Sequence, residues 1–277
     1  MGTPKPLTEA TPDEFIITCM ARQIRDGDIV AQGIATPMVT AAYLLAKKTH
    51  APNLYLMSAI GQGICKEPAK ISITRIENLW LDKAITTIGF VRAVLEGLPR
   101  LTPKEFFRPA QIDCLGNFNN IAFGKNYTAP KFRLPGTGGI PDVTTYVPQY
   151  YFYVPRHSRV TFVKTLDYLS GLGYKPDKPN GKGPVYLVSN LGQFDFRHGR
   201  LRLISIHPGV SIDKILAKTG FEIEIASHLP ITDPPSKEEI ELIRHEIDPL
   251  DSRKLELLSG SKRRALLRKI LDKEKEL

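Results

Sequence analysis

The chain has few cysteines and no long apolar run, and these two absences exclude disulfide-rich proteins and membrane-spanning proteins. Its 277 residues include 3 cysteines, Cys19, Cys65 and Cys114, which lie far apart and form no C-x-x-C pattern. An odd number of scattered thiols argues against a disulfide framework and against a thiolate metal site. No stretch approaches the roughly 20 apolar residues of a membrane span, so we expect no membrane segment. The polar, proline-rich start Met1–Pro6 does not resemble a secretory signal, which predicts a cytoplasmic protein.

The histidines likewise lack the spacing of a metal site. None of the 6 forms an i, i+4 pair or an H-E-x-x-H pattern, so the sequence predicts no metal ligand. His207 precedes Pro208 and Gly209 at a strand end, where it either faces a cleft or is a hydrogen-bonded loop histidine. Cys65 follows a glycine turn and is read either as a reactive thiol or as a buried structural one.

The net charge of +9 is concentrated at the C-terminus. Residues 252–277 contain nine Lys or Arg against four Asp or Glu, a balance of +5, which leaves +4 for the rest. No aromatic residue lies among these bases, so the stacking half of a single-strand nucleic-acid site is missing. We therefore predict no nucleic-acid partner. A mildly basic body instead suits an anionic ligand.

The C-terminal segment has the pattern of a basic amphipathic helix. Between Ser261 and Leu271 the apolar residues fall on one side of a helix, with Lys and Arg around them. This helix packs on its own domain, clamps a partner subunit, or tethers the chain to a membrane surface or RNA. The sequence thus divides into an α/β domain over residues 1–250 and a basic tail over residues 251–277.

The body begins with a β-α-β unit. Asp28–Ala31 reads as a strand, Thr36 and Pro37 as the start of a helix, and Leu54–Gly63 as the returning strand and its glycine turn. A turn of this kind is where open α/β sheets place their ligands. The length and the hydrophobic content of 42% are enough for one large core.

Further elements are predicted from capping residues and from β-branched or aromatic runs. Helices are expected to begin after Thr11, Ser211 and Ser236. Strands are expected at three positions, with a hairpin turn at His198–Gly199: Arg159–Val163, Val185–Val188 and Leu201–Ile206. The apolar spacing from Lys66 to Arg108 fits strand or helix equally, and this segment stays unassigned.

Two further turns carry glycine. Gly136–Gly139 lets backbone amides approach a ligand, as anion-binding loops do, although glycine turns are common. Asp113–Asn117 is a turn by composition, and it is either a tight connection or part of a pocket.

Five blocks of the sequence follow one another in a telling order: Leu54–Gly63, Gln111–Asn117, Leu134–Gly139, Val188–Phe196, and His207–Ser211 continuing to Thr219–Ile223. Together they resemble the β subunit of family I CoA-transferases. The similarity is nearest to the glutaconate CoA-transferase type and to the β subunits of steroid ring-opening CoA hydrolases, and it runs from about Cys19 to Pro249.

The resemblance implies a fold, a partner and a substrate. It implies an α/β fold with an open, mostly parallel sheet and flanking helices, of the CoA-transferase (NagB/RpiA-like) type. It also implies a heteromer with an α-type CoA-transferase subunit, a coenzyme A thioester as substrate, and no covalently bound cofactor. The residues that it assigns to binding of the acyl-CoA are these: Gly61, Gly63, Gln111, Asn117, Gly136, Gly138 and Gly139.

The chain departs from the family where the chemistry is done. Family I transferases have a glutamate at the end of the returning strand, which attacks the acyl-CoA and becomes a glutamyl-CoA thioester. Here the corresponding residue is Ser58, followed by Ala59. Arg108 and Pro109 also stand where glycines usually precede the Ala-Gln of the next block. Covalent catalysis of the family type is therefore excluded at position 58.

Ser58 remains the candidate catalytic position, with three interpretations. As a nucleophile it needs a base, yet no His, Asp or Glu lies between Leu54 and Cys65. It is otherwise a polar group that lines a pocket, or a turn serine that bonds to nearby backbone. Family members without the glutamate include hydrolases and decarboxylases of CoA thioesters. We therefore expect a CoA-thioester hydrolase, C–C lyase or decarboxylase, with a non-catalytic β subunit as the alternative.

Overall fold

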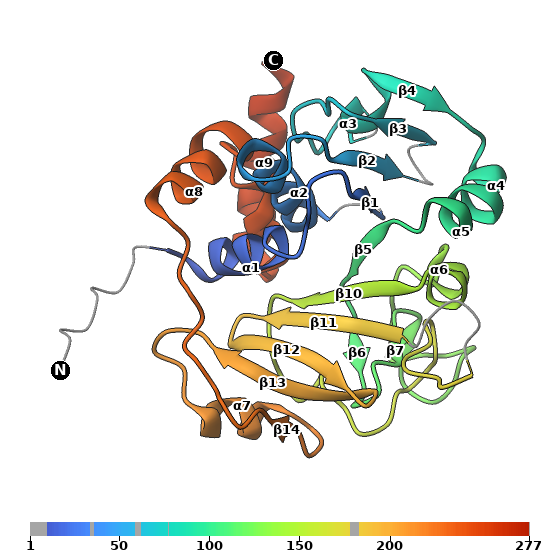
Figure 1. Ribbon diagram of the computed structural model, residues 1–277, viewed down its shortest axis with the longest axis vertical. Coiled ribbons are helices and arrows are strands. Elements are labelled where there is room, and N and C mark those ends of the chain that lie inside the picture. Colours follow the sequence, from blue (N-terminus) through green and yellow to red (C-terminus); the bar gives the residue numbers. More distant parts are fainter. Residues whose placement is uncertain (1–9, 34–35, 59–61, 77, 178–182, 277) are drawn as a thin grey trace.

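A single open sheet runs through the whole protein. The computed structural model describes residues 10–33, 36–58, 62–76, 78–177 and 183–276. Within them ten strands pair in the order β14-β13-β12-β11-β10-β5-β1-β2-β3-β4 (Figure 1). Their bounds are β1 (Ile29–Ala31), β2 (Tyr55–Ser58), β3 (Gly63–Cys65), β4 (Ala84–Thr87), β5 (Lys104–Phe107), β10 (Gln149–Val154), β11 (Gly183–Ser189), β12 (Gly192–Arg197), β13 (Arg200–Ile206) and β14 (Glu224–Ile225).

The five central strands of this sheet are parallel. β2, β1, β5, β10 and β11 pair side by side in one direction, while β3, β4, β12 and β13 add antiparallel hairpins at the two sides. Two short hairpins lie outside the sheet, formed by β6 (Gln111–Ile112) with β7 (Phe118–Asn119) and by β8 (Ala122–Phe123) with β9 (Phe132–Arg133). The architecture matches the fold class that the sequence predicts.

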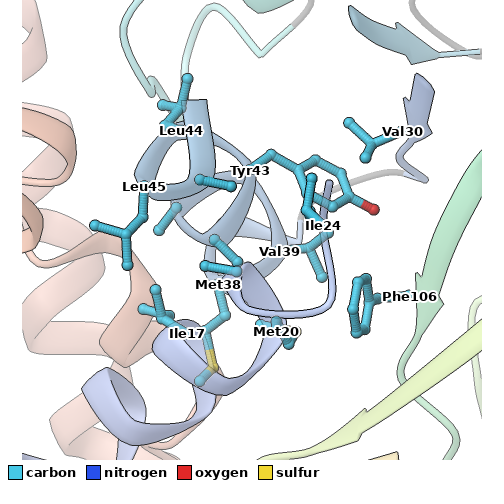
Figure 2. Close-up of a cluster of buried hydrophobic side chains, with 14 of the residues drawn as sticks. Ile17, Met20, Ile24, Val30, Met38, Val39, Tyr43, Leu44, Leu45 and Phe106 are labelled. Atoms are coloured by element: carbon cyan, nitrogen blue, oxygen red, sulfur yellow. The ribbon is translucent and has the colours of Figure 1, made fainter. Parts of the chain in front are cut away.

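The predicted β-α-β unit is present as β1, α2 and β2. Helix α2 (Pro37–Thr49) begins with Pro37 at its first turn. It packs with α1 (Pro12–Ala21) on one face of the sheet, and Figure 2 shows Tyr43 of α2 and Phe106 of β5 within this cluster of buried side chains. The two rings lie 6.3 Å apart between centroids. Burial of this apolar face fixes the end of β1 and β2 against the helix layer.

Shorter helical segments cover the other face and the ends of the sheet. A second cluster of buried side chains includes Ala31, Met57, Phe107 and Tyr150, and it lies under α5 and α6. The remaining helical segments are α3 (Asn78–Leu81), α4 (Phe90–Arg92), η1 (Ala93–Gly97), α5 (Leu98–Leu101), α6 (Ile140–Tyr146), α7 (Ile212–Lys218), α8 (Lys237–Glu241), η2 (Leu242–Ile247), η3 (Ser252–Glu256) and α9 (Gly260–Lys275).

The basic tail forms the predicted helix, α9, and is anchored to the body. The carboxylate of Glu274 accepts hydrogen bonds from the backbone N–H groups of Ile73 and Thr74, each at 2.8 Å. Ile270 is buried beside it. Segment η3, which leads to α9, contacts α2 (Figure 1). The helix therefore packs on its own domain, the first of the three interpretations.

One predicted strand is absent, and one central strand was not predicted. Arg159–Val163 is a turn that touches the sheet region only through an isolated bridge from Phe162 to Ile112. Phe162 is held instead by stacking on His157, with 3.7 Å between ring centroids, while Val160 points to solvent. The strand β10, which lies at the centre of the sheet, had no sequence prediction at all. A buried aromatic residue among β-branched neighbours has the composition of a strand, even where no neighbouring segment of the chain pairs with it.

No helix among the described residues combines the length and the apolar character needed to cross a bilayer.

Candidate active site

The topological switch point of the sheet lies between β1 and β5. From β1 the chain turns to one side to form β2, and β5 then pairs with the opposite side of β1. Ligands of open α/β sheets bind outside the carboxyl ends of the strands at such a point. Ser58 is the last residue of β2, and Ala31 is the last residue of β1. The residues around these two ends define the candidate site.

Ser58 is buried and held by backbone. Its hydroxyl donates a hydrogen bond to the carbonyl oxygen of Gln32 at 3.2 Å. The Gln32 side chain is fixed in turn, because its Nε2 donates to the carbonyl oxygen of Thr36 at 3.2 Å and its Oε1 accepts from the Thr40 hydroxyl at 2.7 Å. A serine oriented toward a backbone carbonyl fits a pocket-lining or turn role better than that of an activated nucleophile.

A small cavity lies next to this network. It measures about 20 Å³ and is lined by Gln32, Thr36 and Thr40 together with residues 71–73, 76 and 79. That volume holds one water molecule and no acyl chain. The hydroxyl oxygen of Thr36 is enclosed and without a hydrogen-bond partner among the described residues, so a water in the cavity would have a polar group to bind.

Two of the glycines predicted to bind the acyl-CoA, Gly61 and Gly63, follow β2 in the sequence. Gly61 lies outside the described residues. Gly63 is buried in β3, where it pairs with Ser58 on one side and Thr87 on the other. The structure thus brings Gly63 directly beside Ser58, and the binding role of both glycines stays a prediction.

Gln111 begins strand β6, and Asn117 lies in the turn between β6 and β7. The Gln111 side chain is buried, and its Oε1 accepts from Asn119 Nδ2 at 2.7 Å and from the Asp167 backbone N–H at 3.0 Å. Asn117 bonds to Asp113 through Nδ2 at 2.9 Å and accepts from the Gly173 N–H at 2.8 Å. Both side chains hold loops together in this structure, which supports the tight-connection interpretation of residues 113–117.

The glycine loop before α6 is open on its outer side. Gly136 has φ +103 and Gly138 has φ +49, conformations that favour glycine. An added Cβ at Gly136, Gly138 or Gly139 would meet nothing within 4 Å. The space beside the loop is therefore free, as a ligand-facing loop requires, and its binding role stays a prediction.

Buried His and Cys side chains elsewhere are unsuited to catalysis. His157 Nδ1 lies 3.0 Å from the Ser189 hydroxyl, a pairing that resembles an activated serine, but both side chains are enclosed. Burial lowers the pKa of His157 to about 3, so it stays neutral. His207 is the predicted hydrogen-bonded histidine, since its Nε2 lies 2.8 Å from the Ser189 carbonyl oxygen. Burial raises the pKa of the Cys65 thiol to about 11, which leaves it unreactive.

Sequence reasoning missed one carboxylate at the switch point. Glu105 is the second residue of β5 and lies opposite Ala31, the last residue of β1. The residue is only 8% exposed. Burial alone raises the pKa of this carboxyl to about 7. The only signal in the sequence is an acidic residue directly before two phenylalanines, and this position fell within the unassigned segment 66–108.

A larger hollow lies at the opposite side of the sheet. It measures about 450 Å³ and is lined by Gln149 and Gly183–Val185, at the amino ends of β10 and β11, and by the β12–β13 turn at His198 and Gly199. None of the residues that the sequence assigns to binding lines it. The switch point therefore remains the candidate site.

Comparison with known proteins settles the family. The coenzyme A transferase family profile matches residues 14–218. The chain belongs to this family. It is 28% identical to the B subunit of glutaconate CoA-transferase from Acidaminococcus fermentans over 261 residues, covering 87% of this chain and 94% of that protein. It is 31% identical to the cholesterol ring-cleaving hydrolase IpdB subunit of Rhodococcus jostii, covering 91% of this chain and 98% of that one.

Solved structures confirm the fold of this CoA-transferase family member. The structure of glutaconate coenzyme A-transferase from Acidaminococcus fermentans matches with a TM-score of 0.78 and 26% identity, over 87% of this chain and 96% of that one. The decarboxylase AibA/AibB matches with a TM-score of 0.75 and 28% identity, over 88% and 97%. Relatives of this chain thus include a transferase, a hydrolase subunit and a decarboxylase.

Proposed function

We propose that this chain is the β subunit of a heteromeric enzyme that acts on acyl-CoA thioesters without a covalent glutamate on β2. The observation that carries the proposal is Ser58 itself: a family member has a buried hydroxyl, bonded to the Gln32 carbonyl oxygen, where transferases of the family have their nucleophilic carboxylate. Such an enzyme needs water or a decarboxylation step in place of a glutamyl-CoA intermediate. Hydrolysis is the reaction that we assign.

The size of the cavity supports a site that is shared with a second subunit. The cavity beside Gln32, whose carbonyl oxygen accepts the Ser58 hydrogen bond, holds only one water, so a bound acyl-CoA needs further walls. Three of the relatives are named as B subunits of CoA-transferases, and the decarboxylase is named AibA/AibB. An α-type CoA-transferase subunit is the partner that these names support.

One apolar surface is suited to that partner. The segment from β4 to α5, together with α6, exposes large apolar side chains, which monomeric surfaces rarely group in this way. They are Ile85, Phe90, Val91, Leu95, Leu101 and Tyr146. Because η1 and α5 cover Met57, the residue before Ser58, a subunit docked on this surface would lie next to the switch point.

Coexpression with the α-type subunit of the same genome tests the proposal. The purified complex is incubated with glutaconyl-CoA, 3-oxoadipyl-CoA and succinyl-CoA, the acyl groups that the names of relatives provide. Release of free thiol is followed with and without acceptor acids. We expect thiol release that needs both subunits and no acceptor acid. Turnover that requires an acceptor acid would make the enzyme a transferase, and a stable complex that consumes none of the acyl-CoAs would assign the chain a stabilising role.

Surface variants test the assigned interface. Val91→Glu should abolish copurification with the α-type subunit, because it places a charge among these apolar side chains. Val160→Glu is the matched control, since both valines are 64% exposed but Val160 belongs neither to the segment from β4 to α5 nor to α6. Equal copurification of the two variants would contradict this interface.

A further inference from the structure

Glu105 differs from the other buried carboxylates near it in having no partner. Among the described residues its carboxyl group makes no hydrogen bond or ion pair, whereas the buried carboxylates of Glu14 and Glu256 are held by Arg244 at 2.7 Å and Arg108 at 3.1 Å. An unpaired buried charge costs several kcal/mol in general, so such groups persist mostly where they serve chemistry.

The cations next to Glu105 in the sequence are engaged elsewhere. Lys104 Nζ lies 2.6 Å from Asp28, and Arg108 bonds to Glu256. Side chains alternate along a strand, so Lys104 and Phe106 point to the helix face of α1 and α2, while Glu105 and Phe107 point to the opposite face. The clustering of Phe106 with Tyr43 and of Phe107 with Tyr150 confirms this alternation.

The face on which Glu105 lies is apolar. The buried side chains of this cluster include small Ala31, directly opposite Glu105, and Met57, which precedes Ser58. The covering segments η1, α5 and α6 contribute Val94, Leu98, Val143 and Val147, and their charged residues Glu96, Arg100 and Asp142 are exposed or half-buried. The titratable groups nearest to this face are the hydroxyls of Tyr150 and Tyr43, which bond to the carbonyl oxygens of Leu172 and Ala31.

Glu105 is almost but not completely enclosed, since 8% of the residue is exposed to solvent. A carboxyl group in apolar surroundings, without a charged partner among the described residues, has the environment of a general acid–base group.

We propose that Glu105 is the catalytic acid–base residue of this enzyme, placed on β5 beside the end of β1 instead of at the end of β2. The inference rests on the proposed acyl-CoA function. In hydrolysis, the Glu105 carboxylate takes one proton of a water as the water oxygen bonds to the thioester carbon. The bond from that carbon to sulfur then breaks, and the proton passes from Glu105 to the departing thiolate. One water and one thioester give one carboxylic acid and one CoA thiol.

Kinetics of the assembled complex test this role. Glu105→Gln keeps the shape of the side chain and removes the proton acceptor. We expect its kcat with the acyl-CoA that the wild-type complex hydrolyses to fall about 100-fold or more, with KM little changed. Glu14→Gln is the matched control: it makes the same change in a buried carboxylate on α1, and its kcat per assembled complex should stay within about threefold.

The pH profile separates chemistry from structure. The wild-type kcat should rise as pH increases through about 7, where the carboxyl with this raised pKa loses its proton, and this rise should vanish in Glu105→Gln. Glu105→Asp keeps a carboxylate on a shorter side chain. Its kcat should be lower than that of the wild type but should still rise with pH, and this variant replaces Glu105→Gln in the test if the Gln variant does not assemble.

Two failures are distinguishable. A Glu105→Gln complex that keeps more than about a third of the wild-type kcat, with an unchanged pH profile, overturns the role of Glu105 while the proposed function stands. A wild-type complex that consumes no acyl-CoA overturns the proposed function, and the catalytic role of Glu105 falls with it.

Discussion

Two regions of this protein bury charged side chains: in one region the charges are paired, and in the other a carboxylate has no charged partner. At the C-terminal junction, residues 248–256, Arg253 is 1% exposed and reaches Asp13 at 2.8 Å, Asp248 at 3.1 Å and Asp251 at 2.9 Å. At the switch point, Glu105 is buried without a charged partner among the described residues. Loss of one partner from a buried pair leaves an uncompensated charge, whereas a carboxylate buried without a partner carries that cost in the native state, which indicates a function.

Removal of the central cation of the junction should have the largest effect on stability. Arg253→Met leaves Asp13 and Asp248 buried without their cation, which typically costs about 3–5 kcal/mol in free energy of unfolding. Urea unfolding measures the loss. Lys254→Met, which changes the partly exposed neighbour, is the control and should cost less than about 0.5 kcal/mol. A loss below about 1 kcal/mol in Arg253→Met would mean that the junction does not hold the tail.

Removal of the unpaired carboxylate should have the opposite sign. The folded-state pKa of Glu105 is raised to about 7, so its contribution to stability is fully present below the ordinary pKa and is lost as pH rises through 7. Glu105→Gln escapes that loss. It should match the wild type near pH 4 and exceed it by up to about 3 kcal/mol above pH 8.

Unfolding free energies from pH 4 to pH 9 measure this difference. Parallel curves for the two proteins would show that Glu105 has a partner in solution. The comparison between the two regions would then lose its basis.

Deletion of the tail helix should have an intermediate effect. A chain without residues 259–277 loses the hydrogen bonds of Glu274 to Ile73 and Thr74 and the burial of Ile270, together about 1–3 kcal/mol. The rate of acyl-CoA turnover per assembled complex should change little, because α9 holds residues 72–74, at the wall of the small cavity, and supplies none of the side chains at the ends of β1, β2 and β5. Thermal unfolding and steady-state rates check both. A truncated complex of normal stability but lower rate would place the tail in the chemistry.

The glycine loop should give the smallest effect. Gly138→Ala introduces a Cβ at φ +49 and should cost about 1 kcal/mol, while Gly139→Ala, at φ −84 with open space around it, should cost almost nothing. Thermal unfolding gives these values. If either variant raises KM for the acyl-CoA without a loss of stability, the loop contacts the substrate. Unchanged KM in both would reduce it to a connection.

The strands and the helix that surround the candidate site were easier to predict from the sequence than the side chains proposed to act in it. The β-α-β unit was readable because Thr36 and Pro37 mark a helix start, and because the following strand ends in a glycine turn. Strands β5 and β10 could not be predicted in this way. Central parallel strands are buried on both faces, so their sequences show no alternation of apolar and polar residues. Glu105 reads in isolation as a surface residue. Its burial depends on packing by α5, α6 and β10, which are distant in the sequence.

The central claim is that this family member turns over acyl-CoA without an acyl or CoA adduct on a carboxylate. Borohydride trapping of the active complex during turnover, followed by mass mapping of peptides, tests it most directly. A glutaconate CoA-transferase that carries the family glutamate serves as the labelled control. We expect unmodified peptides across residues 57–67, where Glu67 is the only acidic residue, and an unmodified Glu105. A trapped adduct on an acidic residue of this chain would contradict the account.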